Sequence, residues 1–161
     1  MPNLRDAALM LSILLMGILL GGIVYSHIVY FPPYLSDLPA SSVLVNGPYA
    51  LHEEYFWLTI HPIAILSLIV SLAVNWKDTA RRKLIAIPLA VYVLAIVVTT
   101  LYFVPELQNF ERSSTMNVSR EEWYARGQRW QHMSWIRGAC LVLSYIPLLL
   151  ALRGDAERRD F

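Results

Sequence analysis

The sequence predicts an all-α integral membrane protein in which four spanning helices form one bundle, a single domain over residues 1–161. Composition is the first reason, because apolar residues make up 57% of the chain and charged residues only 16%, whereas about 25% of an average soluble chain is charged. The second reason is that four segments reach the roughly 20 mostly apolar residues that a helix needs to cross a bilayer. Prolines and polar turn residues separate these segments, which places a connection between successive helices.

The first predicted span covers residues 7–30. It is expected to remain as an uncleaved helix, because a signal peptide has a shorter apolar core and a small-residue cleavage site. Phe31-Pro32-Pro33 is expected to end the helix, since paired prolines cannot continue its hydrogen bonding. Within the span, the spacing Gly17-x-x-x-Gly21 forms a small-residue stripe of the kind that lets helices approach closely.

The second predicted span covers residues 53–76. Asn46-Gly47-Pro48 precedes it and looks like a helix start, because proline in the first turn costs no hydrogen bond. Pro62 removes one backbone donor and is expected to bend the helix beside His61.

The third predicted span covers residues 84–104, and Pro105 is expected to mark its end. The fourth covers residues 133–152. Its helix is expected to start earlier, outside the membrane, because the sequence from Ser119 to Glu122 has the form of a capping box. The fourth helix therefore extends beyond the bilayer on one side.

The distribution of Lys and Arg predicts the orientation of the bundle. Eight lie on the side of the N-terminus (Arg5, Lys77, Arg81, Arg82, Lys83, Arg153, Arg158 and Arg159) and four on the other side (Arg112, Arg120, Arg126 and Arg129). Because positive residues are enriched in cytoplasmic loops, both termini are expected in the cytoplasm. An inner or plasma membrane location is expected, with the extension of the fourth helix on the extracytoplasmic side.

Charge and cysteine content exclude several classes of function. The net charge of +1 provides no basic surplus for binding nucleic acid. The single cysteine, Cys140, excludes an intrachain disulfide and a cysteine-based metal centre within one chain. The sequence contains no nucleophile triad, phosphate-binding loop or nucleotide-binding fingerprint.

Unusual polar residues of the four spans are expected to lie at one level, toward the extracytoplasmic side. His27 lies near the outer end of the first span, His61 in the outer half of the second, Glu106 just past the third, and His132 and Arg137 at the start of the fourth. Ionisable residues inside a membrane are costly and are functional candidates by default. For His27 and His132, an ordinary interfacial position is the alternative interpretation.

One helix face of the second span is expected to look into the bundle. Glu54, Trp57 and His61 lie at positions i, i+3 and i+7, so they share a face of an α-helix. The aromatic residues of the chain, Tyr102 and Trp130 among them, are expected to form an interfacial belt. The same rings would also suit the walls of a pocket for a flat aromatic ligand.

Short motifs resemble those of a known family. They are His27 with the Pro32-Pro33 pair, Phe103-Val104-Pro105-Glu106-Leu107-x-x-Phe110, and Arg129-Trp130 followed by Arg137. In these motifs and in the order of its spans, the chain resembles the anthrone-oxygenase-like family of small four-helix membrane proteins. The family usually has Leu-Asn where this chain has Glu106-Leu107. The resemblance implies a four-helix membrane fold and, from the named oxygenases of the group, the conversion of an anthrone to an anthraquinone.

The expected function is that of a small oxygenase-like oxidoreductase acting on a hydrophobic aromatic or quinone-type substrate, which the bilayer delivers to an outer-leaflet pocket. His61, tuned by Glu54, is expected to be the general base, because an imidazole titrates near neutral pH. Arg137, oriented by Glu106, is expected to hold the resulting oxyanion, since low dielectric strengthens this attraction. The residues expected to contact the substrate are His27, Trp57, Tyr102, Trp130 and His132.

Two other functions fit the same residues. One is a non-enzymatic membrane accessory or small-ligand-binding protein. The other is metal or haem binding, including electron transfer, with His27, His61 and His132 as candidate ligands for copper or zinc, or with two of them as ligands of haem in a four-helix bundle. None of these histidines has close ligand spacing, so no cofactor is assigned. The expected partners are membrane lipid and a hydrophobic small molecule from the bilayer, and oligomerisation is left open.

Overall fold

The computed structural model describes the backbone of residues 4–159 and the side chains of residues 4–152. Over that range the chain is helical and contains no strand. Four helical segments are long and apolar enough to cross a membrane: Leu4–Leu35, Glu53–Val74, Thr79–Glu111 and Arg120–Leu152. The predicted all-α bundle of four candidate membrane-spanning helices is therefore confirmed.

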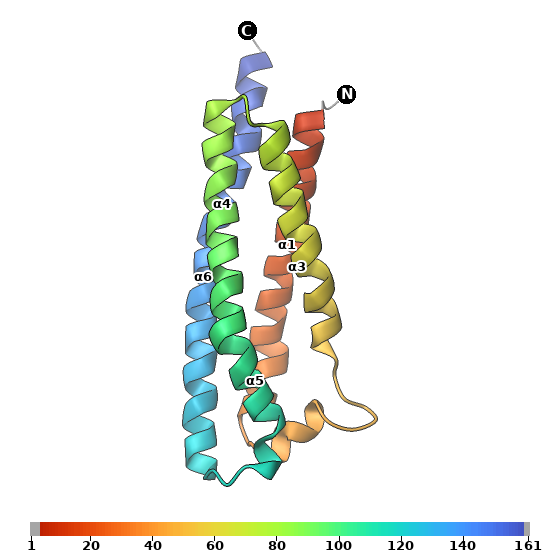
Figure 1. Ribbon diagram of the computed structural model, residues 1–161, viewed down its shortest axis with the longest axis vertical. Helices are drawn as coiled ribbons and strands as arrows, with labels where there is room; N and C mark the ends of the chain where they lie inside the picture. The colour runs from red at the N-terminus through yellow and green to blue at the C-terminus, as the bar shows by residue number, and fades with distance from the viewer. Residues whose placement is uncertain (1–3, 160–161) are drawn as a thin grey trace.

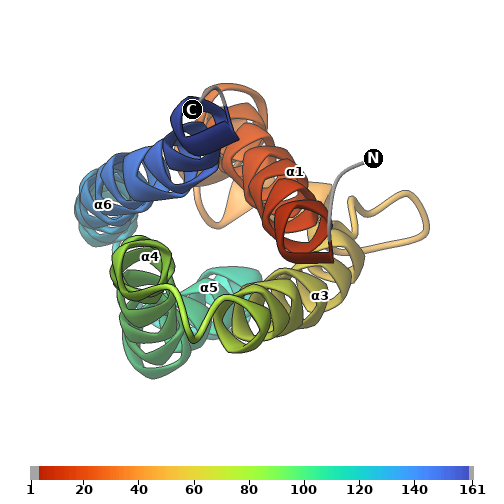
Figure 2. The ribbon, with the colours of Figure 1, turned by 90° about the horizontal axis from the view of Figure 1, so that it is seen from above.

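The four spans form a closed ring when viewed along the bundle axis (Figure 2). α1 (Leu4–Tyr25) packs against α3 (Glu53–Val74) and α6 (Arg120–Arg159), and α4 (Thr79–Val98) packs against the same two helices. The start of α1 and the end of α6 lie at one end of the bundle, which we call the terminal end (Figure 1). The opposite end, where residues 36–52 and 112–119 connect the spans, is the loop end.

The first span continues past its prolines, so the predicted end at Phe31-Pro32-Pro33 is wrong. A π-helical turn, Ser26–Tyr30, follows α1, and α2 (Phe31–Leu35) extends the helix. In the interior of an α-helix, a proline ring clashes with the carbonyl four residues earlier. Here the wider π turn changes the hydrogen-bond ladder, and proline occupies the first turn of α2, where its missing N–H does no harm.

The third span repeats this arrangement. α4 begins at Thr79, earlier than predicted, because Asp78 caps it by accepting hydrogen bonds from the backbone N–H groups of Ala80 and Arg81. A π turn, Thr99–Phe103, is followed by α5 (Val104–Glu111), with proline again in the first turn. The predicted end of the helix at residue 104 is therefore wrong for the same physical reason.

Of the helix starts predicted for the second and fourth spans, the first is wrong and the second is confirmed. Asn46-Gly47-Pro48 does not start the second helix: Gly47 has a φ of 104° in a turn, a conformation that suits glycine, and α3 begins only at Glu53. The capping box is confirmed in its first half, because Ser119 Oγ accepts a hydrogen bond of 3.2 Å from the backbone N–H of Glu122. α6 begins at the next residue, Arg120.

Gly22, next to the predicted small-residue stripe of Gly17 and Gly21, is the glycine of α1 that lies close to side chains of α3. A Cβ at Gly22 would lie 2.5 Å from a ring carbon of Phe56, whereas a Cβ at Gly21 would meet nothing within 4 Å. Gly17 lies beside the hydroxyl of Tyr145 on α6. The absence of a side chain at Gly22 therefore leaves room for the ring of Phe56 from α3.

Two clusters of buried apolar side chains hold the bundle together. One runs along the spans and includes Met16, Leu68, Tyr92 and Leu148. The other lies toward the loop end and includes Tyr34, Phe110, Trp123 and Trp130. Many large apolar side chains outside these clusters are exposed, for example Leu14, Leu58, Leu94, Leu101 and Leu143. Such an apolar surface is rare on a soluble monomer and suits contact with lipid.

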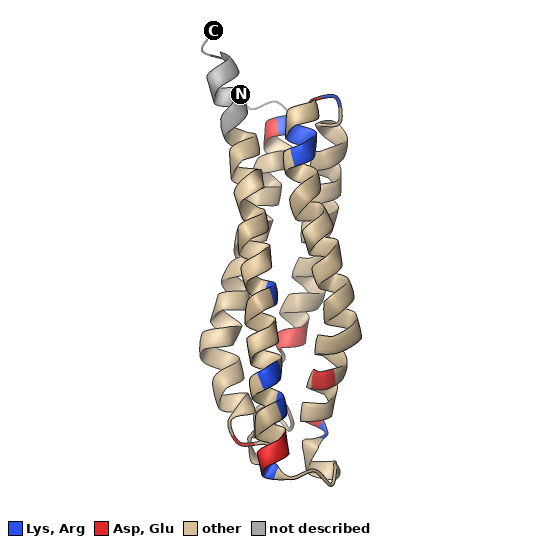
Figure 3. Cartoon of the chain, turned by 90° about the vertical axis from the view of Figure 1, so that its left-hand side faces the viewer, with Lys and Arg blue, Asp and Glu red and all other residues tan. Residues whose placement is uncertain are grey.

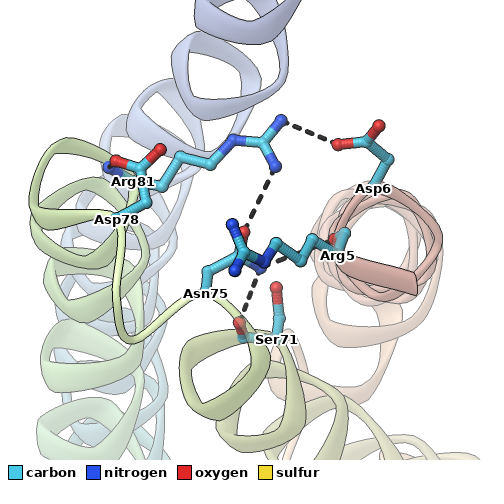
Figure 4. Close-up of polar contacts among 6 residues, drawn as sticks. All are labelled: Arg5, Asp6, Ser71, Asn75, Asp78 and Arg81. Atoms are coloured by element: carbon cyan, nitrogen blue, oxygen red, sulfur yellow. Dashed lines mark hydrogen bonds and ion pairs between the residues drawn. The ribbon is translucent and has the colours of Figure 1, made fainter. Parts of the chain in front are cut away.

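Charged residues gather toward the two ends of the bundle and are sparse between them (Figure 3). At the terminal end, Arg81 is 4% exposed and donates a hydrogen bond of 2.9 Å to Asp6, which is also 4% exposed (Figure 4). Arg81 also donates to the side-chain oxygen of Asn75, whose amide donates to the carbonyl of Ser71. This network links α1, the end of α3 and the start of α4.

Candidate functional site

Arg137 of α6 is the centre of a polar cluster in the loop-end half of the bundle. Its guanidinium donates hydrogen bonds to Thr99 Oγ1 at 2.6 Å and to Ser134 Oγ at 2.9 Å. It also lies over the ring of Phe103, with Cζ 4.0 Å from the ring centroid. Both hydrogen-bond acceptors are neutral hydroxyls. Among the residues whose side chains are described, no carboxylate forms an ion pair with Arg137.

His27 lies in the π turn of the first span and is 3% exposed. Its Nδ1 is 2.7 Å from the carbonyl oxygen of Ile23, while its Nε2 is buried and has no hydrogen-bond partner among the described residues. Aromatic rings surround the imidazole: the centroids of Trp135, Phe31 and Trp130 lie 4.6, 5.5 and 6.5 Å away. The charge of Arg137 lies within electrostatic range of this imidazole.

His61 of α3 also contributes to the cluster. Its Nδ1 is hydrogen-bonded to the hydroxyl of Tyr92 at 2.6 Å, and Tyr92 on α4 is fully buried. The ring of Trp57 stacks on the imidazole at 5.5 Å between centroids. Arg137 lies within electrostatic range of His61 as it does of His27. All four spans therefore supply side chains to one region, although the third span contributes Tyr92 and Thr99 in place of the predicted Glu106.

Glu53, and not the predicted Glu54, shares a face with Trp57 and His61. Glu53 accepts hydrogen bonds from Ser26 Oγ at 2.5 Å and from the indole N–H of Trp57 at 3.3 Å. Glu54 is exposed and is bonded to the side chain of His52 at 2.7 Å. The predicted contact between Glu54 and His61 is thus wrong. Residues three or four apart are neighbours on a helix, so either Glu53 or Glu54 can share a face with Trp57 and His61, and the sequence does not distinguish the two.

Glu106 does not orient Arg137. It accepts two hydrogen bonds of 2.6 Å from Arg126 and one of 3.0 Å from Asn109. Because the helix continues past Pro105, Glu106 lies farther toward the loop end than expected. It therefore meets α6 at Arg126, about three turns before Arg137. The groups that orient Arg137 are Thr99 and Ser134, which sequence reasoning missed.

The remaining predicted site residues divide between the interior and the surface. Trp130 is buried and donates a hydrogen bond of 3.1 Å to the carbonyl of Phe103. His132 is exposed on α6, and Tyr102 is 37% exposed. With His132 outside, the three predicted histidines do not converge. Within the described part of the chain, no group of three or more His, Cys, Asp or Glu side chains is arranged to hold a metal ion.

The two π turns provide much of the cluster. His27 lies in the first of them, and Thr99 and Phe103 lie in the second. π turns within α-helices occur often at functional sites. The available sequence signal was the proline that follows each turn inside an otherwise continuous apolar segment, at Pro32 and Pro105.

No family model, curated protein or solved structure matches the chain. The resemblance to the anthrone-oxygenase-like family therefore depends on the sequence motifs alone.

Proposed function

We propose that this protein is a small integral-membrane oxidoreductase, oxygenase-like, that acts on a hydrophobic aromatic or quinone-type substrate. One observation carries the proposal: Arg137 lies inside a candidate span, and among the described residues its side-chain hydrogen bonds go to the hydroxyls of Thr99 and Ser134. A cation inside a membrane protein is costly and normally has a charged or ligand partner. A guanidinium held by neutral groups is suited to bind an oxyanion of a ligand.

The surroundings of Arg137 favour a flat, apolar ligand. Aromatic side chains from three helical segments, Trp57, Phe103 and Trp130, contact the residues of the cluster. Aromatic rings stack on planar ligands, and pockets of this kind commonly combine apolar walls with a few polar groups. The exposed apolar surface of the spans supports delivery of such a ligand from the bilayer.

The proposed reaction consumes molecular oxygen and a substrate with an acidic CH2 group conjugated to an aromatic carbonyl. An imidazole of the cluster accepts one proton, and Arg137 stabilises the resulting anion through its oxygen. The carbanion carbon forms a bond with O2, and the peroxide anion regains the proton. Loss of water from the hydroperoxide then breaks the O–O bond. One oxygen atom ends in the new carbonyl group and the other in water.

The proposed orientation places this cluster on the extracytoplasmic side of an inner or plasma membrane. The support is the excess of Lys and Arg on the side of the two termini. The cluster lies in the loop-end half of the bundle, away from those residues.

Anthrone is the probe for this function. Purified protein in detergent is expected to accelerate oxygen uptake and anthraquinone formation over a protein-free control. Arg137→Gln is expected to lower the rate by roughly 100-fold or more, the usual cost of removing an oxyanion donor. The matched control is Arg129→Gln, which removes an exposed arginine of the same helix.

Wild-type turnover by a folded Arg137→Gln variant would refute the assigned role of Arg137. Binding of anthrone without turnover in the wild-type protein would favour the alternative, a non-enzymatic ligand-binding protein.

A further inference from the structure

The hydrogen bond between His27 and Ile23 determines which nitrogen of this imidazole carries the proton. Nδ1 lies 2.7 Å from the carbonyl oxygen of Ile23. A carbonyl oxygen can only accept, so Nδ1 is the donor. In the neutral ring, Nε2 then has a free lone pair.

This lone pair is enclosed by the protein but is not used by it. Nε2 is buried and has no hydrogen-bond partner among the side chains and backbone that the structure describes. The imidazole ring that carries it is surrounded by the rings of Phe31, Trp130 and Trp135. Buried polar atoms without a partner are rare in folded proteins, and each calls for an explanation such as a ligand.

His61 presents the opposite group. Its Nδ1 is bonded to the hydroxyl of Tyr92, which is fully buried and has no second partner among the described residues. The phenolic proton is satisfied only when it is donated to Nδ1, and this leaves the proton of the neutral imidazole on Nε2. His61 therefore presents a donor, where His27 presents an acceptor.

We infer that His27, rather than His61, is the proton acceptor of the site, and that the site takes ligands with a phenol-type hydroxyl. The O–H group of the ligand donates to His27 Nε2, and the same oxygen accepts from the guanidinium of Arg137. Proton transfer from oxygen to Nε2 produces a phenolate held by Arg137. For a CH2-carbonyl substrate, this is the same anion that loss of the carbon-bound proton gives from the keto form.

This inference rests on the proposed function for the position of the ligand but does not depend on turnover. The test is nitrogen NMR of the full chain in detergent, with 15N-labelled histidine. The protein has four histidines, and the variants His52→Gln, His61→Gln and His132→Gln assign their signals by elimination. His27 is expected to show a protonated Nδ1 and an unprotonated Nε2 in the absence of any ligand.

The ligand arm compares 1-naphthol with 1-methoxynaphthalene, which has the same ring system but no O–H donor. 1-Naphthol is expected to shift the Nε2 signal of His27 toward that of a hydrogen-bonded nitrogen, and the ether is expected to leave it unchanged. A protonated Nε2 in the free protein would overturn the inference. So would equal shifts with the two compounds, or a response to 1-naphthol at His61 alone or at no histidine.

The variant Arg137→Gln separates this inference from the proposed function. If 1-naphthol shifts the Nε2 signal of His27 in the wild-type protein but not in Arg137→Gln, the roles assigned to His27 and to Arg137 both stand. If the shift persists in the variant at the same concentration of 1-naphthol, the inference for His27 stands and the role of Arg137 fails.

Discussion

Thr99 Oγ1 accepts a hydrogen bond of 2.6 Å from Arg137, and Thr99 is the first residue of the second π turn. Ser26 holds the same place in the first π turn and donates to Glu53 at 2.5 Å. In each case a hydroxyl at the start of the turn bonds an ionisable side chain of the next span. The π turns therefore do more than accommodate the prolines, since they also orient the charged groups of the cluster.

Replacement of Thr99 by valine tests this orientation. A hydrogen bond to a charged group contributes about 1.5–3 kcal/mol, so Thr99→Val is expected to weaken the binding of 1-naphthol roughly ten- to hundredfold. Thr100→Val is the control, because Thr100 is exposed and its hydroxyl donates a hydrogen bond to the carbonyl of Ile96 in its own helix. Titration of ligand binding to both purified variants provides the comparison. Equal affinities of the two variants would show that Thr99 does not orient Arg137.

The carboxylate next to Trp57 is the subject of a second prediction. Glu53→Gln is expected to loosen Trp57 and thereby the ring stacked on His61, because the indole N–H loses its charged acceptor. The expected result is a several-fold loss of affinity for 1-naphthol. Glu54→Gln changes only an exposed pair with His52 and is expected to leave affinity unaltered. A larger loss of affinity in Glu54→Gln than in Glu53→Gln would contradict this prediction and would support the face predicted from the sequence, with Glu54 beside Trp57 and His61.

Packing at Gly22 leads to a third prediction. Gly22→Ala places a methyl group 2.5 Å from a ring carbon of Phe56, so either this ring or the helices that carry the two residues must shift. Overpacking of this kind costs about 1–3 kcal/mol. Gly21→Ala meets open space and is expected to leave stability unchanged or slightly higher. Thermal unfolding of the two variants in one detergent checks this, and equal midpoints would contradict it.

The buried pair at the terminal end provides a fourth prediction. Asp6→Leu removes the carboxylate that lies 2.9 Å from the buried guanidinium of Arg81, and breaking a buried ion pair in this way typically costs about 3–5 kcal/mol. The double replacement Asp6→Leu with Arg81→Met is expected to recover most of that loss, since it removes both charges. Lys83→Met, at an exposed position of the helix that carries Arg81, is the control. Unfolding in denaturant should show the single variant to be less stable than the double variant.

Sequence reasoning located the polar cluster but paired its members incorrectly. Arg137 lies within electrostatic range of both His27 and His61, and their common level could be predicted because each depth follows from the distance along an apolar segment. The partners of a side chain depend instead on the rotation of its helix. Glu53, and not Glu54, bonds Trp57, and the side chains of two successive residues point about 100° apart around the helix axis.

The proline positions show the same limit in the backbone. Pro32 and Pro105 were interpreted as helix ends because proline interrupts an α-helix. The π turns that allow the helices to continue are stabilised by contacts between spans, such as those of Ser26 and Thr99. No pattern within a single segment contains that information.

By itself the sequence determined an all-α bundle of four spans and the depth of His27, His61 and Arg137 along them. These are properties of hydrophobic length and of position along a segment, and each can be evaluated locally. Only the tertiary structure decided that Arg137 is held by Thr99 and Ser134, that Glu106 binds Arg126, and that His132 is excluded from the interior. Those outcomes depend on how helices rotate and pack against one another, because the contact energy of a side chain is set by its neighbours in space.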